Sequence, residues 1–155
     1  MSAVLYRYMC NSCGTSFDAS GVPEMSYGEF ILRSESSEEV FLEAITNQAF
    51  NDVCKIVDDY MANSNIDPNS SEDIVQKVFG SICDYGEKGE QFHIGLMPVC
   101  PNCLSRDMAS WKMINPVQLS KIENATQTKW ASLNDAQRKA LIYEKIRICS
   151  AQKPI

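Results

Sequence analysis

Apolar and polar positions alternate at the start of the chain and recur at helical spacing further along. Residues 3–10, AVLYRYMC, alternate roughly and are rich in aromatic and β-branched side chains, which predicts a short strand. Residues 14–20, GTSFDAS, would be the returning strand of a hairpin. Residues 27–34, YGEFILRS, fit either a strand or a loop. The first part of the chain is therefore expected to contain a β-hairpin.

A long helix is predicted from Ser36 to about Ala62. Ser36 and Glu39 have the spacing of a capping box, in which each side chain satisfies a free backbone N–H. Apolar residues then recur three and four positions apart, as they do on the buried face of a helix: Leu42, Ile45, Ala49, Val53, Ile56 and Tyr60. Residues 63–71, NSNIDPNSS, predict a loop, because polar turn formers surround Pro68.

A second helix is predicted between Ser70 and Gly86. Ser70 is the candidate cap, and Glu72 and Asp73 suit the positive end of a helix. Gly86 suits the left-handed turn that ends many helices. The apolar stripe consists of Ile74, Val75, Val78, Phe79, Ile82 and Cys83. The two helices together would form an acidic helical hairpin.

Two more strands and two more helices are predicted in the last third of the chain. Residues 90–99, EQFHIGLMPV, and residues 108–114, MASWKMI, have strand-like composition. Asn115 is a candidate cap with Pro116 at the first helical position, and that helix is expected to end before Trp130. A final helix would start at Ser132 or Asn134 and run through residues 136–149.

Charge is distributed unevenly along the 155 residues. Sixteen acidic and four basic residues lie between Asp18 and Glu90, a net charge of −12, whereas eight basic and three acidic residues follow from Ser110, a net charge of +5. Solvated helical faces are one explanation. Another is a basic segment that meets nucleic acid or an acidic partner. The candidate contacts would be Lys112, Lys129, Arg138, Lys139, Lys145 and Arg147.

The composition predicts an ordered protein of the cytoplasm. At 45% hydrophobic residues the chain is able to bury a core. No apolar run approaches the roughly 18 residues of a membrane span, and residues 1–10 lack the features of a secretory signal. No membrane partner is therefore expected. In the cytoplasm, paired cysteines serve as metal ligands or redox groups more often than as structural disulfides.

Four of the seven cysteines form two Cys-x-x-Cys pairs, Cys10 with Cys13 and Cys100 with Cys103. Each pair follows a predicted strand, so each is expected at a tight turn where two sulfurs converge. Two such turns supply the four thiolates that Zn²⁺ accepts in a tetrahedron. A thioredoxin-like redox site would instead need its pair at the start of a helix. The remaining cysteines, Cys54, Cys83 and Cys149, lie on or near predicted apolar helix faces and are expected to pack as small hydrophobes.

The two pairs are separated by 86 residues, far more than in a compact zinc site. Loop-closure entropy rises only by about 0.6 kcal/mol per doubling of loop length, so the separation does not forbid a shared site. The predicted fold class is α+β: a small β zinc ribbon from residues 1–33 and 88–114, an inserted acidic helical hairpin from residues 34–87, and a C-terminal extension of basic helices from residues 115–155.

The residues around the pairs resemble known zinc ribbons. LYRYMCNSCGTSFD, residues 5–18, is similar to the start of the small FmdB-type zinc-ribbon proteins, and rubredoxin-like ribbons close with Cys-Pro-x-Cys, as CPNC does here. The resemblance covers under a quarter of the chain and implies a ribbon with Cys10, Cys13, Cys100 and Cys103 as ligands. Leu104 departs from the pattern, since glycine commonly follows the second pair and relieves a positive φ.

The metal is expected to be one structural zinc ion per chain, with iron as the alternative because four thiolates also suit it. His93 could lie beside the metal ligands, replace one of them, or occupy an ordinary strand position on the surface or partly buried. Four cysteines leave no open coordination position, so an enzyme is not expected.

Three functions are compatible with this reading. The leading hypothesis is a non-enzymatic binding module in transcription or another nucleic-acid process, because Trp111, Trp130 and Tyr143 accompany the basic residues and aromatic rings stack on nucleobases. The alternative is a protein-interaction adaptor or inhibitor that acts through its acidic helical insertion. A rubredoxin-like iron electron carrier is the third.

Overall fold

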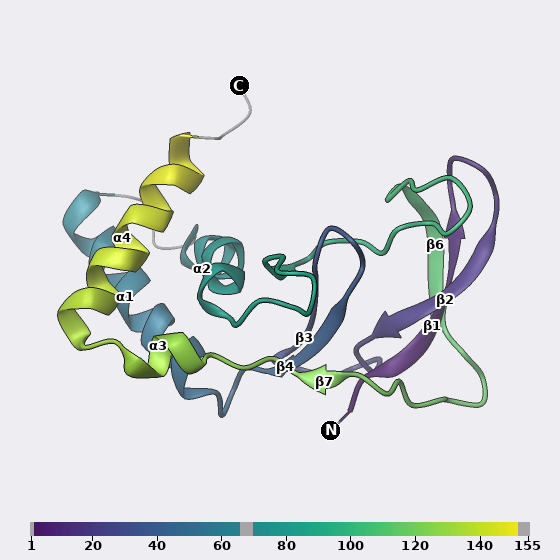
Figure 1. The fold of residues 1–155 in the computed structure, drawn as a ribbon, viewed down its shortest axis with the longest axis horizontal. Helices are drawn as coiled ribbons and strands as arrows, with labels where there is room; N and C mark the ends of the chain where they lie inside the picture. The colour runs from purple at the N-terminus through teal and green to yellow at the C-terminus, as the bar shows by residue number, and fades with distance from the viewer. Residues whose placement is uncertain (1, 66–69, 152–155) are drawn as a thin grey trace.

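The computed structural model describes residues 2–65 and 70–151. The fold is α+β, as predicted, with two small sheets and four α-helices. A three-stranded sheet lies at one end of the molecule, a four-stranded sheet lies in the middle, and the helices gather at the other end (Figure 1). Pro68 in the predicted loop and residues 152–155 of the predicted C-terminal extension lie outside the described residues. No helix in the described ranges has the length and apolar character needed to cross a membrane.

The first sheet is an antiparallel ribbon with the strand order β2-β1-β6. Its strands are β1 (Val4–Cys10), β2 (Ser16–Gly21) and β6 (Met108–Met113). The predicted hairpin and the predicted strand over residues 108–114 are therefore confirmed. Tyr8 pairs with Phe17 on one side and with Trp111 on the other, and its ring stacks on both at centroid distances of 5.8 and 6.4 Å. This aromatic row stiffens the sheet that carries the cysteines.

The second sheet has the order β5-β3-β4-β7 and was only partly predicted. Its strands are β3 (Glu29–Arg33), β4 (Glu39–Glu43), β5 (His93–Ile94) and β7 (Glu123–Asn124). Residues 27–34, which fitted a strand or a loop, supply β3, and the strand predicted over residues 90–99 shortens to β5. β3 thus pairs with β4, which comes from the segment predicted to be a helical hairpin.

The prediction of a helix from Ser36 is wrong for its first twelve residues, because α1 (Gln48–Ser64) begins later. The side chain of Ser36 bonds Glu90 instead of capping a helix, and Glu39 pairs with Arg33. Residues 39–43 instead fold back on β3 as an antiparallel hairpin, in which Arg33 lies opposite Glu39 and Glu29 lies opposite Glu43. The observed cap is Asn47, whose side chain accepts a hydrogen bond from the Phe50 backbone N–H at 2.8 Å.

The second helix, α2 (Ser71–Phe79), ends seven residues before Gly86 and passes into one 3₁₀ turn, η2 (Gly80–Ile82). Ser70 occupies the predicted N-cap position of this helix, but its side chain makes no capping hydrogen bond. The backbone at Gly80 lies so close to the backbone carbonyl of Phe92 that a Cβ at this position would collide with it. Glycine at this position therefore permits the close approach of the segment before β5.

No helix forms from Pro116, which corrects a third prediction. The backbone N–H of Leu5 donates to the Gln118 carbonyl at 2.8 Å, and that of Ser120 donates to the Ala3 carbonyl at 2.9 Å. These bonds hold the segment along β1 before it enters β7, beside β4. Helices follow only later, as α3 (Thr128–Ser132) and α4 (Asp135–Ala151).

The predicted start of the last helix is confirmed. Asn134 accepts from the backbone N–H of Gln137 at 2.8 Å, and the Gln137 side chain accepts from the backbone N–H of Asn134 at 2.9 Å. This reciprocal pair is a capping box. α4 then buries Ile142 and Ile146 completely against α1 and α2.

The main core fills the space between the second sheet and the helices. It includes Leu32, Leu42, Val53, Val57, Phe79, Ile142 and Ile146. A smaller apolar cluster of Ala3, Ile31 and Phe41 lies on the opposite face of the second sheet. Arg33 also projects from that face, and its guanidinium bonds Glu39 at 2.7 Å, the Leu96 carbonyl at 2.9 Å and the Ser20 carbonyl of the ribbon. Arg33 therefore ties the two sheets together.

Candidate metal centre

The two Cys-x-x-Cys turns have nearly the same backbone geometry. The backbone N–H of Cys10 donates to the Thr15 carbonyl at 2.9 Å, and that of Cys100 donates to the Ser105 carbonyl at 2.8 Å. In each turn the residue after the second cysteine donates back to the first cysteine's carbonyl at 2.9 Å. These residues are Gly14 and Leu104, with φ of 75° and 64°. Leu104 thus has the positive φ that glycine usually provides at this position, a conformation that is uncommon for a leucine.

The fold brings all four sulfurs together, within 4.8 Å of one another. The Sγ atoms of Cys10 and Cys103 are 3.5 Å apart, and those of Cys13 and Cys100 are 3.6 Å apart. A disulfide bond requires about 2.05 Å, so these are free thiols facing one another. Four ligands at about 2.3 Å from a zinc ion form a tetrahedron with edges of about 3.8 Å. The spacing of the sulfurs therefore fits such an ion.

Polar contacts join the two turns beside the sulfurs. The hydroxyl groups of Ser12 and Ser105 are 2.9 Å apart. Asn11 donates through its side chain to the Asp107 carboxylate at 3.0 Å and through its backbone N–H to the Asp107 carbonyl at 2.8 Å. These hydrogen bonds hold the first cysteine turn against the second, although the two turns are remote in the sequence.

The pKa values of Cys13 and Cys103 shift in opposite directions. Hydrogen bonding with the side chains of Thr15 and Asn102 lowers the pKa of Cys13 to about 5. The Ser105 backbone N–H lowers the pKa of Cys103, but the Cys10 sulfur, burial and the other two sulfurs together outweigh it and raise this pKa to about 12. Four thiolates at this spacing repel one another, and a divalent ion removes that repulsion. The donor set therefore fits a thiophilic metal, and its geometry does not distinguish zinc from iron.

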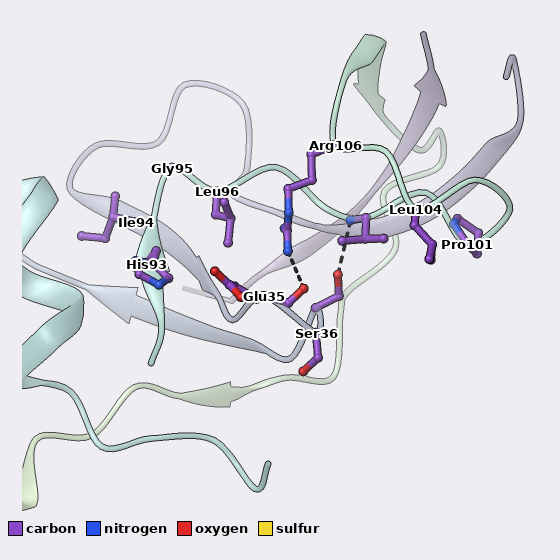
Figure 2. Close-up of a pocket in the computed structure, with 11 residues that line it drawn as sticks. Glu35, Ser36, His93, Ile94, Gly95, Leu96, Pro101, Leu104 and Arg106 are labelled. Carbon is purple, nitrogen blue, oxygen red and sulfur yellow. Dashed lines mark hydrogen bonds between the residues drawn. The ribbon is translucent and has the colours of Figure 1, made fainter. Parts of the chain in front are cut away.

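His93 lies in β5, opposite Arg33, and does not belong to the sulfur cluster. It lines an open groove of about 820 Å³ beside the second cysteine turn. Figure 2 shows His93 at one end of this groove and Pro101 and Leu104 at the other, with Glu35 and Arg106 between them. Within the described ranges, the four cysteines are the one cluster of histidine, cysteine or carboxylate groups arranged to hold a metal.

The other three cysteines lie in or beside the helices, away from this cluster. Cys83 is buried, and Cys54 and Cys149 are half-buried. Burial raises the pKa of Cys83 to about 11, which keeps its thiol protonated. Cys54 and Cys83 pack with the main core as predicted.

The six basic residues predicted to bind a partner do not form one surface. Lys112 lies on β6, at the end of the molecule opposite α4 (Figure 1). The others belong to α3 and α4: Lys129, Arg138, Lys139, Lys145 and Arg147. Lys129 and Lys139 each lie over a tyrosine ring, at 5.7 and 5.4 Å from the ring centre.

Arg138 is engaged within the protein. Its guanidinium lies 3.5 Å from the Asp52 carboxylate and 5.3 Å from the centre of the Trp130 ring. Trp130 itself is 3% exposed, so it does not offer a face for a nucleobase. Trp111, by contrast, is 53% exposed on the ribbon.

The sequence did not reveal a pocket of about 290 Å³ between β3, α1 and α2. Four separate stretches of the chain line it, and no local pattern links them. Phe30, Phe50 and Val75 are among its apolar lining residues, and Asp58 and Glu72 are its charged ones.

Comparison with models of known protein families, with curated proteins and with solved structures finds no match to this chain. The fold and the site thus define the class of protein directly. In the part of the chain that the structure describes, it is an α+β protein with two small sheets, four α-helices and a four-cysteine cluster compatible with a zinc-ribbon motif.

Proposed function

We propose that Cys10, Cys13, Cys100 and Cys103 hold one structural zinc ion, and that the protein is a non-enzymatic interaction module in the cytoplasm. The mutual approach of the four sulfurs within 4.8 Å carries this proposal. Four protein ligands complete the tetrahedron that zinc adopts and leave no position for a substrate or a reactive water. A metal bound in this way stabilises the fold, and a partner would bind to the surface of the folded protein.

The surface best suited to a partner is the acidic surface formed by α1 and α2. Asp58 and Asp59 of α1 and Glu72 and Asp73 of α2 are all exposed. They belong to the stretch with a net charge of −12, which repels nucleic acid and attracts basic surfaces. We therefore favour an adaptor or inhibitor that binds a basic protein partner through this acidic surface.

The test is co-purification of a partner after nuclease treatment. The tagged protein is compared with an Asp59→Asn/Asp73→Asn variant of the same fold. A stoichiometric protein that survives nuclease treatment and falls away with the variant is the expected result. A partner lost on nuclease treatment alone would overturn the adaptor function.

Nucleic-acid binding, in transcription or a related process, is the second candidate, and the ribbon supports it. Trp111 is half-exposed and stacked on Tyr8. Lys112 and Arg7 form the next cross-strand pair and project from the opposite face of the sheet, where Arg7 pairs with Asp18 at 3.0 Å. The exposed ring therefore carries this candidate, because an exposed aromatic ring suits a stacked base. Affinity for mixed-sequence DNA or RNA should fall steeply with salt and drop in a Trp111→Ala variant. Absence of binding at low salt would eliminate this candidate.

A further inference from the structure

The pocket between β3, α1 and α2 has the features of a docking site for a single apolar side chain. Its volume of about 290 Å³ is at the lower limit of small-molecule sites, which suits one side chain better than a whole ligand. Val75 and Ala44, both over 90% buried, connect its lining to the main core. Phe30 and Phe50 add stacked rings with centroids 6.1 Å apart.

The edge of the pocket exposes large apolar side chains. Tyr27 is 82% exposed and Ile45 is 55% exposed, although both line the pocket. Gly28 has a φ of 73°, and a Cβ there would collide with the Ile45 side chain, which lies 2.6 Å from that position. The absence of a side chain at Gly28 thus leaves room for Ile45, which lies at the opening of the pocket. Exposed apolar side chains beside a polar edge are typical of protein interaction sites.

The charge around the pocket has one sign. Asp58 from α1 and Glu72 from α2 line it, and the described lining residues include no lysine, arginine or histidine. The negative charge also acts on Cys54, which lines the pocket. Burial raises the pKa of its thiol, and the Asp58 and Glu72 carboxylates raise it further. An apolar pocket bordered by carboxylates complements an apolar side chain flanked by cations.

We propose that this pocket binds a basic peptide segment of a partner protein, with one leucine-like side chain inserted between Phe50 and Val75 and with flanking lysines or arginines facing Asp58 and Glu72. The proposal rests on the adaptor function and specifies the chemistry of its partner.

Two fluorescent peptides test the proposal by anisotropy on the full chain. One has a central leucine between lysines, and the other carries serine in place of that leucine. The leucine peptide should bind about 10- to 100-fold more tightly, the equivalent of burying one such side chain. Asp58→Asn/Glu72→Gln should weaken it by about 2- to 30-fold, as expected for two exposed ion pairs. Glu123→Gln/Glu144→Gln removes the same charge elsewhere and should change little.

A filling substitution tests the pocket itself. Cys54→Phe should abolish the preference for leucine, and Cys54→Ala should preserve it. Ile45→Ser, at the exposed edge, should reduce the preference and serves as the second variant if Cys54→Phe does not fold. Equal binding of both peptides, unaffected by these variants, would refute insertion of a leucine into the pocket but would leave the proposed acidic adaptor surface standing. Failure of both peptides to bind at low salt would overturn the pocket and the acidic contact together.

Discussion

Replacing Cys100 by serine should weaken zinc binding and destabilise the ribbon. Cys100 is fully buried, and its sulfur lies 3.6 Å from Cys13 Sγ and 3.4 Å from the Asn102 backbone nitrogen. A structural zinc ion contributes on the order of 10–16 kcal/mol in small domains. Divided equally among four thiolates, one ligand contributes about 2.5–4 kcal/mol. The expected loss of zinc affinity is therefore about 60- to 700-fold.

The assay is competition with a chromophoric zinc chelator, together with metal content by mass spectrometry on protein purified without added metal. The wild-type chain should carry one zinc ion, and chelation should lower its unfolding temperature toward that of Cys100→Ser. Visible absorption of the purified protein would instead indicate iron, since zinc thiolates do not absorb there.

Cys149→Ser is the matched control, because Cys149 is half-buried in α4 and lies outside the cluster. It should leave zinc affinity unchanged. Wild-type affinity in Cys100→Ser, or an equal loss in Cys149→Ser, would refute a shared four-thiolate centre.

Three further substitutions test the fold, each by urea unfolding. Arg33→Met should cost about 3–5 kcal/mol, because it leaves the Glu39 carboxylate without its partner at 2.7 Å between the sheets. Gly80→Ala should cost about 1–3 kcal/mol, because the added methyl group meets the Phe92 carbonyl. Asn134→Ala should cost about 1 kcal/mol and reduce helicity, because it removes the cap of α4.

Each of these has an outcome that contradicts it. If Arg33→Met and an Arg33→Met/Glu39→Gln double variant are equally stable, the unpaired carboxylate is not the source of the cost. An unchanged midpoint for Gly80→Ala would mean that the backbone shifts freely at this point. Slower amide exchange at the start of α4 in Asn134→Ala would exclude the capping role.

The sequence predicted each Cys-x-x-Cys turn well because the residue types and spacing that define it are local. Cys10 and Cys13 have a spacing that only a few structures use, and the strand before them has an alternating pattern of its own. The last helix was also predicted, with Ser132 or Asn134 as its start, and the structure selects Asn134, which forms a capping box with Gln137.

The second sheet was difficult to predict because its strands are short and because β5 and β7 come from segments remote from β3 and β4. Residues 39–43 fit both a strand and the start of a helix, and pairing with β3 decides between them. The segment after Pro116 has good helix-start residues, yet its backbone groups bond to β1 and β4 instead. Tertiary hydrogen bonds override local preference when a segment is too short to form a stable helix alone.

The sequence by itself determined the two Cys-x-x-Cys pairs, the ribbon strands beside them, the last helix and the uneven charge, because residue type and spacing encode these features. Only the tertiary structure decided that the sulfurs converge across 86 intervening residues, that Arg138 is neutralised by Asp52, and that an acid-bordered pocket opens beside Phe50. These depend on which distant segments share backbone hydrogen bonds and a common core, and no window along the chain contains that information.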